Sequence, residues 1–199
     1  NTQYVYVLNP DVLLNKDTFS NINRSITNLE NFAILSPISD NLNYPNYRIN
    51  KNNELIEDNI IKNVEEIDGY SMIINKNYFS DNIFFDEKIF MYLENVDLCL
   101  RARKNNGKLF IIKNSKIHHS GAKAVDDKYS EEIELSRNWH WMWSKFYFNK
   151  KHKGIFVSLF IGLTSLIGNS VKYFIYSITF NNKRNIYKMR MSGIINSLF

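Results

Sequence analysis

The chain has 199 residues, of which 44% are hydrophobic and 15% aromatic, and this composition excludes an intrinsically disordered protein. Its length is sufficient for one sizeable core and for one or two domains. The formal net charge of +5 is unevenly distributed: residues 1–137 carry 16 basic and all 20 acidic side chains, whereas residues 138–199 carry nine basic and no acidic ones. The single cysteine, Cys99, excludes an internal disulfide.

The N-terminal part alternates between strand-like and helix-like patterns. Residues 4–8 form an apolar, β-branched and aromatic run that stops at a proline, which predicts a buried strand with Asp11 just beyond its carboxyl end. Apolar residues at helical spacing predict a helix over 15–30, and residues 32–36 predict a second strand. Taken alone, Asp11 is equally well explained as an Asx-type turn residue at a strand end.

The middle of the chain continues this pattern. Residues 39–63 are rich in asparagine and predict a loop or an edge hairpin. Strands are predicted at 68–74, which begins with a glycine turn, and at 108–112, and a long helix is predicted at 129–148. Strands and helices mixed in this way indicate a layered α/β domain.

Residues 84–101 carry four carboxylates among aromatic and aliphatic side chains. Carboxylates in apolar surroundings lose hydration, so each needs a partner, a metal ion or a chemical role. A helix is predicted over 94–104, in which Glu94, Asp97 and Arg101 share a face that is presented outward while the opposite face packs. The alternative is a capped helix whose Asp97–Arg101 pair only stabilises it locally.

Residues 155–180 are almost entirely apolar and have basic residues on both sides. The uninterrupted stretch before Lys172 is close to the shortest length that spans a bilayer. An in-plane helix or shallow hairpin keeps both basic flanks on one anionic leaflet, a single span sends one of them across, and a packed soluble helix needs no membrane. Of these three, in-plane attachment is the prediction.

Four motifs in one order resemble those of family 2 glycosyltransferases, in particular the bacterial rhamnosyltransferase-like branch. They are N-P-D at 9–11, F-D-E-K-I-F-M-Y-L-E-N-V-D-L-C-L-R at 85–101, H-H-S-G at 118–121 and S-R-N at 136–138. The resemblance implies the C-terminal part of a GT-A domain, an α/β fold that is Rossmann-like with a mixed sheet. We therefore expect that part over 1–150, with its N-terminal nucleotide-binding portion missing, followed by a basic, apolar, α-helical, membrane-associated tail over 151–199.

The resemblance also implies a divalent metal ion, Mn²⁺ or Mg²⁺. The aspartate that ends the family's metal motif corresponds to Asp11, and Asn9 takes the place of the leading residue of that motif. His118 and His119 fall where the family often has a histidine that reaches the metal or the diphosphate. Neighbouring residues of a strand point to opposite sides, so one of the two is expected to face the site, and His119 is preferred. A purely structural histidine remains the alternative.

The family's general base belongs to a glutamate–aspartate pair, which corresponds here to Glu94 and Asn95. The amide of Asn95 cannot take a proton, so the base is either Glu94, which is preferred, or Asp97. The remaining positions assigned to donor or acceptor binding are Asn9, Asp68, Gly69, Tyr70, Arg101 and Arg137.

The resemblance implies an inverting transferase that moves a sugar from a nucleotide-sugar donor to a saccharide or lipid-linked saccharide acceptor in bacterial cell-surface polysaccharide synthesis. It would act peripherally at the cytoplasmic face of the cell membrane, against its anionic surface, and this chain alone is expected to be inactive. The alternative is a non-catalytic, membrane-associated binding or scaffold protein of the same fold, which the amide at Asn95 favours. Nucleic-acid binding is not expected, because the basic residues flank an apolar stretch instead of lining an aromatic groove.

Overall fold

The structure is a computed structural model, and it describes residues 2–29, 31–41, 43–49, 60–79, 83–121 and 127–198. The chain divides into two compact units. The first, here called the sheet unit, comprises residues 1–86 and 95–124, and the second, the helical unit, comprises residues 87–94 and 125–199. The fold is mixed α/β, as the sequence predicts.

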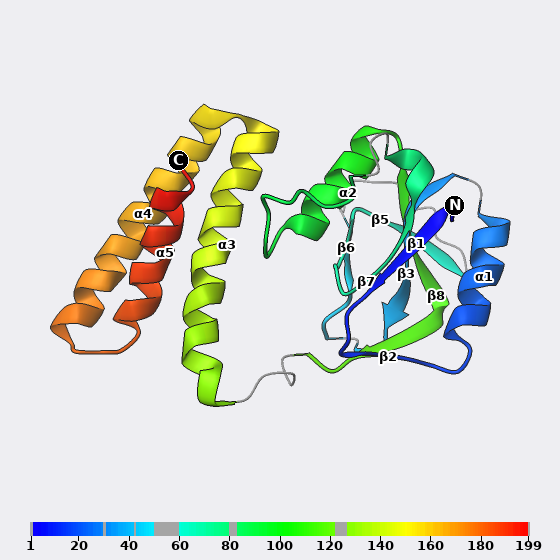
Figure 1. Cartoon of the computed structure of the whole chain (residues 1–199), viewed down its shortest axis with the longest axis horizontal. Helices are drawn as coiled ribbons and strands as arrows, with labels where there is room; N and C mark the ends of the chain where they lie inside the picture. The colour runs from blue at the N-terminus through cyan, green and yellow to red at the C-terminus, as the bar shows by residue number, and fades with distance from the viewer. Residues whose placement is uncertain are drawn as a thin grey trace. The chain divides into compact units, whose positions relative to one another are not determined.

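The described residues of the sheet unit form a main mixed sheet, a separate two-stranded sheet and the helices that pack against the main sheet (Figure 1). Its strands are β1 (Tyr4–Leu8), β2 (Val12–Leu14), β3 (Phe32–Ser39), β4 (Tyr47–Arg48), β5 (Ile61–Val64), β6 (Glu66–Ile67), β7 (Ser71–Asn75) and β8 (Lys108–His119). Its helices are α1 (Thr18–Asn28), α2 (Glu94–Lys104), whose first residue is counted with the helical unit, and the short 3₁₀ turn Lys76–Tyr78. The main sheet has the order β1-β7-β3-β8-β2, with β5 paired to β8, and β4 pairs separately with β6.

Strand direction places several loops at one edge of the main sheet. β3 and β8 are parallel, and β7 runs antiparallel to both β1 and β3. The carboxyl ends of β1, β3 and β8 therefore lie at the same edge as the beginning of β7. In open α/β sheets, this is the edge at which ligands bind.

Two apolar clusters lie on the two faces of the sheet, because alternate strand residues point in opposite directions. Ile34, Ile74 and Ile111 pack in one cluster with Leu98, Cys99 and Ala102 of α2. Leu35, Ile73 and Phe110 pack in the other with Ile22 of α1. This three-layer arrangement fixes the sheet between its helices and holds its carboxyl edge in place.

The helical unit consists of α3 (Ser130–Lys153), α4 (Ile155–Ile178) and α5 (Arg184–Asn196), preceded by the 3₁₀ turn Asp127–Tyr129. The three long helices pack side by side, with consecutive helices running in opposite directions (Figure 1). α4 is long and apolar enough to cross a membrane by length and composition.

The structure differs from the predicted elements in three places. β8 extends to His119 instead of ending near residue 112, because its second half pairs with the unpredicted strand β2. The region 39–63 contributes β4 and part of β5, and residues 50–59 lie outside the described residues. The division expected at residue 150 is displaced, because α3 packs with α4 and α5.

Candidate functional site

Polar residues from four separate segments meet at the carboxyl edge of the main sheet. Asp11 follows β1, Asp40 follows β3, the turn 68–70 precedes β7, and residues 118–119 end β8. The antiparallel register of β2 and β8 sets Val12 opposite His119. Strand pairing thereby brings together two of the four sequence motifs, N-P-D at 9–11 and H-H-S-G at 118–121, with the 68–70 turn and Asp40 beside them.

Asp11 and His119 form the centre of this group. His119 Nε2 lies 3.1 Å from Asp11 Oδ2, and the two side chains are 28% and 23% exposed. The backbone N–H of Ser120 donates to the Asp11 carbonyl at 3.1 Å, which fixes the loop after β1 against the end of β8. The pair is accessible to a ligand, and the backbone bond between Ser120 and Asp11 holds the two segments that carry it together. Of the two histidines, His119 is the one that lies beside Asp11, and whether it faces a metal ion stays a prediction.

Tyr70 covers the imidazole of His119. The two rings are stacked, with centroids 4.0 Å apart and an interplanar angle of 18°. The phenol hydroxyl bonds to Ser39, and burial raises the pKa of Tyr70 above its usual value, with Asp68 and Asp40 adding to the shift and the Ser39 bond opposing it. Tyr70 is therefore a neutral aromatic side chain whose stacked ring orients His119.

Asp68 is a partly buried acid at this edge. Burial raises the pKa of Asp68, and its electrostatic interactions with Arg48 and His119 oppose that rise. Its backbone N–H donates to the carbonyl of Asn46 at 2.9 Å, so the 68–70 turn is anchored to the loop before β4.

His118 points to the other side of β8, as the alternation of a strand requires. Its Nδ1 lies 3.0 Å from Asp40 Oδ2, and the two side chains are 51% and 40% exposed. This second histidine–carboxylate pair was not predicted. Asp40 could have been found by the reasoning used for Asp11, because it also directly follows a strand.

Asn46 is a second residue that the sequence did not single out. Its side chain is fully buried. The amide nitrogen donates to Ser36 Oγ at 3.1 Å and to the Pro37 carbonyl at 2.8 Å, while the oxygen accepts from the N–H of Ser39 at 2.9 Å. Asn46 thus folds the loop after β3 back onto that strand and positions both Ser39 and Asp40.

The donor set fits a divalent cation that also binds a diphosphate. The described residues contain no group of three or more His, Cys, Asp or Glu side chains that could hold a metal ion by themselves. Mg²⁺ typically takes only one or two protein carboxylates and completes its shell with substrate phosphates and water. Asp11 offers a carboxylate oxygen and His119 an imidazole nitrogen, which suits Mn²⁺ as well. The residues present are therefore sufficient for a shared cation.

On α2, the outward presentation predicted for Asp97 is wrong. Its carboxylate is fully buried and accepts a hydrogen bond from Arg101 Nε at 2.8 Å. Arg101 also donates to the carbonyl oxygens of Ile83, at 3.1 Å, and of Phe84. Asp97 and Arg101 therefore act as a structural pair that ties the 83–84 segment to α2, because this face of the helix also packs.

Asn95, the departure from the family pattern, has a local structural role. Its amide donates to the Ile67 carbonyl at 2.9 Å, at the end of β6 and directly before Asp68. An aspartate at position 95 could not make this bond, because an ionised carboxylate only accepts.

Glu94 is the first residue of α2 and is described with the helical unit. Burial raises its pKa, and its buried Oε2 has no hydrogen-bond partner among the described residues. Directly before it, Tyr92 and Leu93 adopt left-handed φ angles of 67° and 66°. Such strain in non-glycine residues clusters at functional sites.

The strained segment is fastened to α3 within the helical unit. Ser144 Oγ donates to the Met91 carbonyl at 2.7 Å, and Trp141 packs edge-on against Tyr92 with ring centroids 5.5 Å apart. α3 thereby holds the backbone that leads into Glu94.

The remaining predicted residues are at the surface or in turns. Asn9 is exposed, and its N–H donates to the Tyr70 carbonyl at 2.9 Å, which joins the end of β1 to the start of β7. Gly69 lies in the turn between Asp68 and Tyr70. Arg137 is exposed on α3 in the helical unit.

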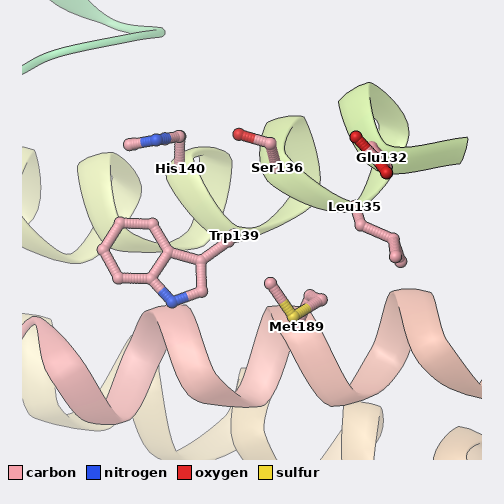
Figure 2. A pocket seen from close by; sticks show the side chains of 6 residues that line it. All are labelled: Glu132, Leu135, Ser136, Trp139, His140 and Met189. Carbon is pink, nitrogen blue, oxygen red and sulfur yellow. The ribbon is translucent and has the colours of Figure 1, made fainter. Parts of the chain in front are cut away.

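A separate hollow of about 370 Å³ lies between α3 and α5 (Figure 2). Apolar surface dominates its lining, and the indole of Trp139 points toward α5, where Trp139 Nε1 donates to Ser192 Oγ at 3.2 Å. Burial lowers the pKa of His140 on its rim. The residues that line it are Glu132, Leu135, Ser136, Trp139, His140 and Met189.

Comparisons with known proteins leave the family open. No family model matches the chain, and no curated protein matches it. Among solved structures, the chain is similar to the crystal structure of A197 from STIV, with 11% sequence identity and a TM-score of 0.40. The match covers 59% of this chain and spans 57% of the length of that protein. Likeness at this level carries no argument about function.

Proposed function

We propose that the chain is the C-terminal part of a GT-A, family 2 glycosyltransferase that moves a sugar from a nucleotide-sugar donor to a saccharide or lipid-linked saccharide acceptor. One observation carries the proposal: Asp11 and His119, which lie in two motifs 108 residues apart, are paired at 3.1 Å on the ligand-binding edge of the sheet. A chance resemblance in sequence gives no reason for these two side chains to meet.

Four residues at this edge have a role in the proposed reaction. Asp11 and His119 would hold a Mn²⁺ or Mg²⁺ ion together with the donor diphosphate, and Tyr70 keeps the imidazole in the orientation that this requires. When bound, the ion would neutralise charge on the departing nucleotide. Asp68, whose pKa burial raises, is suited to accept a hydrogen bond from a sugar hydroxyl.

Glu94 is the preferred general base. A base is most effective when its pKa lies near the working pH, and burial moves the pKa of Glu94 in that direction. Its unpartnered oxygen is free to receive the proton of an acceptor hydroxyl while the nucleotide leaves with inversion at the anomeric carbon. Asp97 is unsuited to this role, since its carboxylate is buried and bound to Arg101.

The test measures release of nucleoside diphosphate by the complete protein, with a panel of nucleotide sugars, Mn²⁺ and candidate acceptors. Asp11→Asn should abolish metal-dependent donor binding, and Glu94→Gln should keep donor binding while lowering turnover by at least about a hundredfold. Asp17→Asn, which alters an exposed carboxylate, is the matched control and should leave both unchanged.

Full turnover in Glu94→Gln would remove the base assignment, and metal-independent donor binding in Asp11→Asn would remove the proposed site. The alternative, a non-catalytic binding or scaffold protein of the same fold, predicts donor binding without turnover in the unaltered complete protein. The amide of Asn95 is only weak support for that alternative, because the hydrogen bond from Asn95 to Ile67 explains an amide at this position without loss of catalysis.

We propose that the enzyme acts peripherally at the cytoplasmic face of the cell membrane.

A further inference from the structure

α4 has its small and polar residues inside and its large apolar residues outside. Ser158 is fully buried and Asn169 is 8% exposed, whereas Phe156, Phe160 and Leu163 are 84%, 71% and 58% exposed. Only 17% of the residues in its most apolar stretch are buried. A helix of a water-soluble bundle shows the opposite distribution.

Seven of the exposed apolar residues of α4 form one continuous stripe, here called the α4 stripe. At 100° per residue its members fall within an arc of about 80°, and it extends for roughly 33 Å along the helix. Every member is more than half exposed. The α4 stripe consists of Phe156, Phe160, Leu163, Ile167, Val171, Phe174 and Ile178.

The inner face of α4 is built for close helix packing. Ser158 Oγ donates to the Ile155 carbonyl and Asn169 Nδ2 to the Ser165 carbonyl, both at 2.7 Å, so these polar groups are satisfied within the helix. At Gly162, a Cβ atom would lie 2.9 Å from the ring of Phe146 on α3. Small residues at helix contacts with apolar residues outward are typical of proteins in contact with lipid.

Lys172 does not interrupt the stripe. Its ammonium lies 5.5 Å from the centroid of the Tyr187 ring on α5, so its side chain turns toward the neighbouring helix. The charge that breaks the apolar run in the sequence is thus removed from the outer face.

The surroundings of the stripe are positively charged. The last turn of α3, directly before α4, carries Lys150, Lys151 and Lys153, and the start of α5, after the far end of α4, carries Lys183 and Arg184. No acidic residue occurs anywhere in 138–199. Basic residues at both ends of an apolar stripe complement an anionic lipid surface.

The neighbouring helices exclude a perpendicular orientation. α3 and α5 pack alongside α4 and carry Arg137, Lys145, Lys188 and Arg190 along their lengths. If α4 crossed the bilayer, these charges would be drawn into hydrocarbon at considerable cost.

We propose that the α4 stripe lies in the plane of an anionic bilayer, immersed to the acyl boundary, with α3 and α5 on its aqueous side. The proposal needs no glycosyl transfer, and its test involves neither donor nor acceptor.

The first experiment is co-flotation of the chain with vesicles of phosphatidylcholine, with or without roughly a third of phosphatidylglycerol. The triple variant Phe160→Gln, Ile167→Gln, Phe174→Gln should bind the anionic vesicles at least about tenfold more weakly than the unaltered chain. The control carries Leu13→Gln and Phe19→Gln, which alter residues of the sheet unit that are 61% and 56% exposed, and should bind normally. Equal binding by the triple variant would overturn the proposal.

The second experiment measures depth, with a fluorophore attached to a single new cysteine at position 160, 167 or 174 and quenched by lipid-borne groups. Cys99 does not compete for the label, because it is fully buried and burial raises the pKa of its thiol to about 12. In-plane insertion predicts one shared, shallow depth. A label at 167 about 10 Å deeper than the other two would establish a spanning helix and refute the proposal. Absence of lipid quenching, with dimerisation by light scattering, would refute it in favour of a second copy of this chain.

Discussion

The two acids at the start of α2 should respond in opposite ways to removal of their charge. Asp97 is fully buried and bonded to Arg101 at 2.8 Å, so Asp97→Asn leaves a cationic partner without its counter-charge. Hydrogen bonds to charged groups contribute about 1.5–3 kcal/mol, and the new amide oxygen retains part of one. We expect a loss of about 2 kcal/mol, which for a chain of this size lowers the melting temperature by roughly 4–8 °C.

Glu94→Gln should instead leave stability unchanged or raise it at neutral pH. Burial raises the pKa of Glu94, so its protonated form is favoured by folding, and this contribution is lost as pH rises through the folded-state pKa. Above that pKa the ionised carboxylate opposes folding, and the neutral amide removes the penalty. The advantage of the variant should therefore shrink as the solution is acidified.

Thermal melting followed by circular dichroism, between acid and neutral pH, measures both effects on the chain itself. Asp17→Asn is again the control, since it removes one exposed carboxylate and should not move the melting temperature appreciably. The reasoning fails if Asp97→Asn melts with the unaltered chain, or if Glu94→Gln loses as much stability as Asp97→Asn. The first result would free Asp97 for a catalytic role, and the second would make Glu94 a structural residue.

Two further substitutions test contacts that stabilise the sheet unit and the helical unit. Asn46→Ala should destabilise the sheet unit by about 2–4 kcal/mol, because it removes three hydrogen bonds at the end of β3 and leaves the N–H of Ser39 without its acceptor, while Ser36 Oγ still donates to the Pro37 carbonyl. Urea unfolding followed by circular dichroism measures this, and Asn23→Ala, on the exposed surface of α1, is the control. Gly193→Ala should destabilise the packing of α3 on α5 by about 1–3 kcal/mol, because its Cβ would clash with the carbonyl oxygen of Trp139. Tryptophan fluorescence should then report a more exposed Trp139, and an unchanged spectrum and melting temperature would contradict the close approach.

The carboxyl edge of the sheet was predictable in part, because some strand ends are visible in a sequence. The apolar run that stops before Asp11 places that residue just beyond a strand, whereas the apolar run at 108–112 ends before the polar residues 113–116 and does not by itself place His119 at a strand end. Their pairing depends on β2, three residues whose pattern is too short to predict a strand. Once β2 pairs with β8, Val12 is set opposite His119 and the contact follows.

Position 97 shows why helical periodicity alone was insufficient to predict which side chains of α2 are buried. Periodicity separates two faces of a helix, but it does not say whether one or both of them are covered. Here residues 83–84 cover the polar face of α2, to which Arg101 binds them. Asp97 is therefore buried on the face that the helical periodicity predicted to be exposed. A carboxylate in an apolar run was correctly expected to need a partner, and the partner lay one helical turn away.

The family resemblance and the structure lead to different interpretations of the amide at position 95. Read as a missing acid, it favours a protein that has lost catalysis. In the structure it donates to the carbonyl of Ile67, at the strand end from which Asp68 and Tyr70 follow toward His119. An acid there would forfeit that bond and set a negative charge against a carbonyl oxygen. Asn95 is therefore explained by the support it gives to the 68–70 turn, and the choice between enzyme and binding protein depends on whether the desolvated carboxylate of Glu94 accepts a proton.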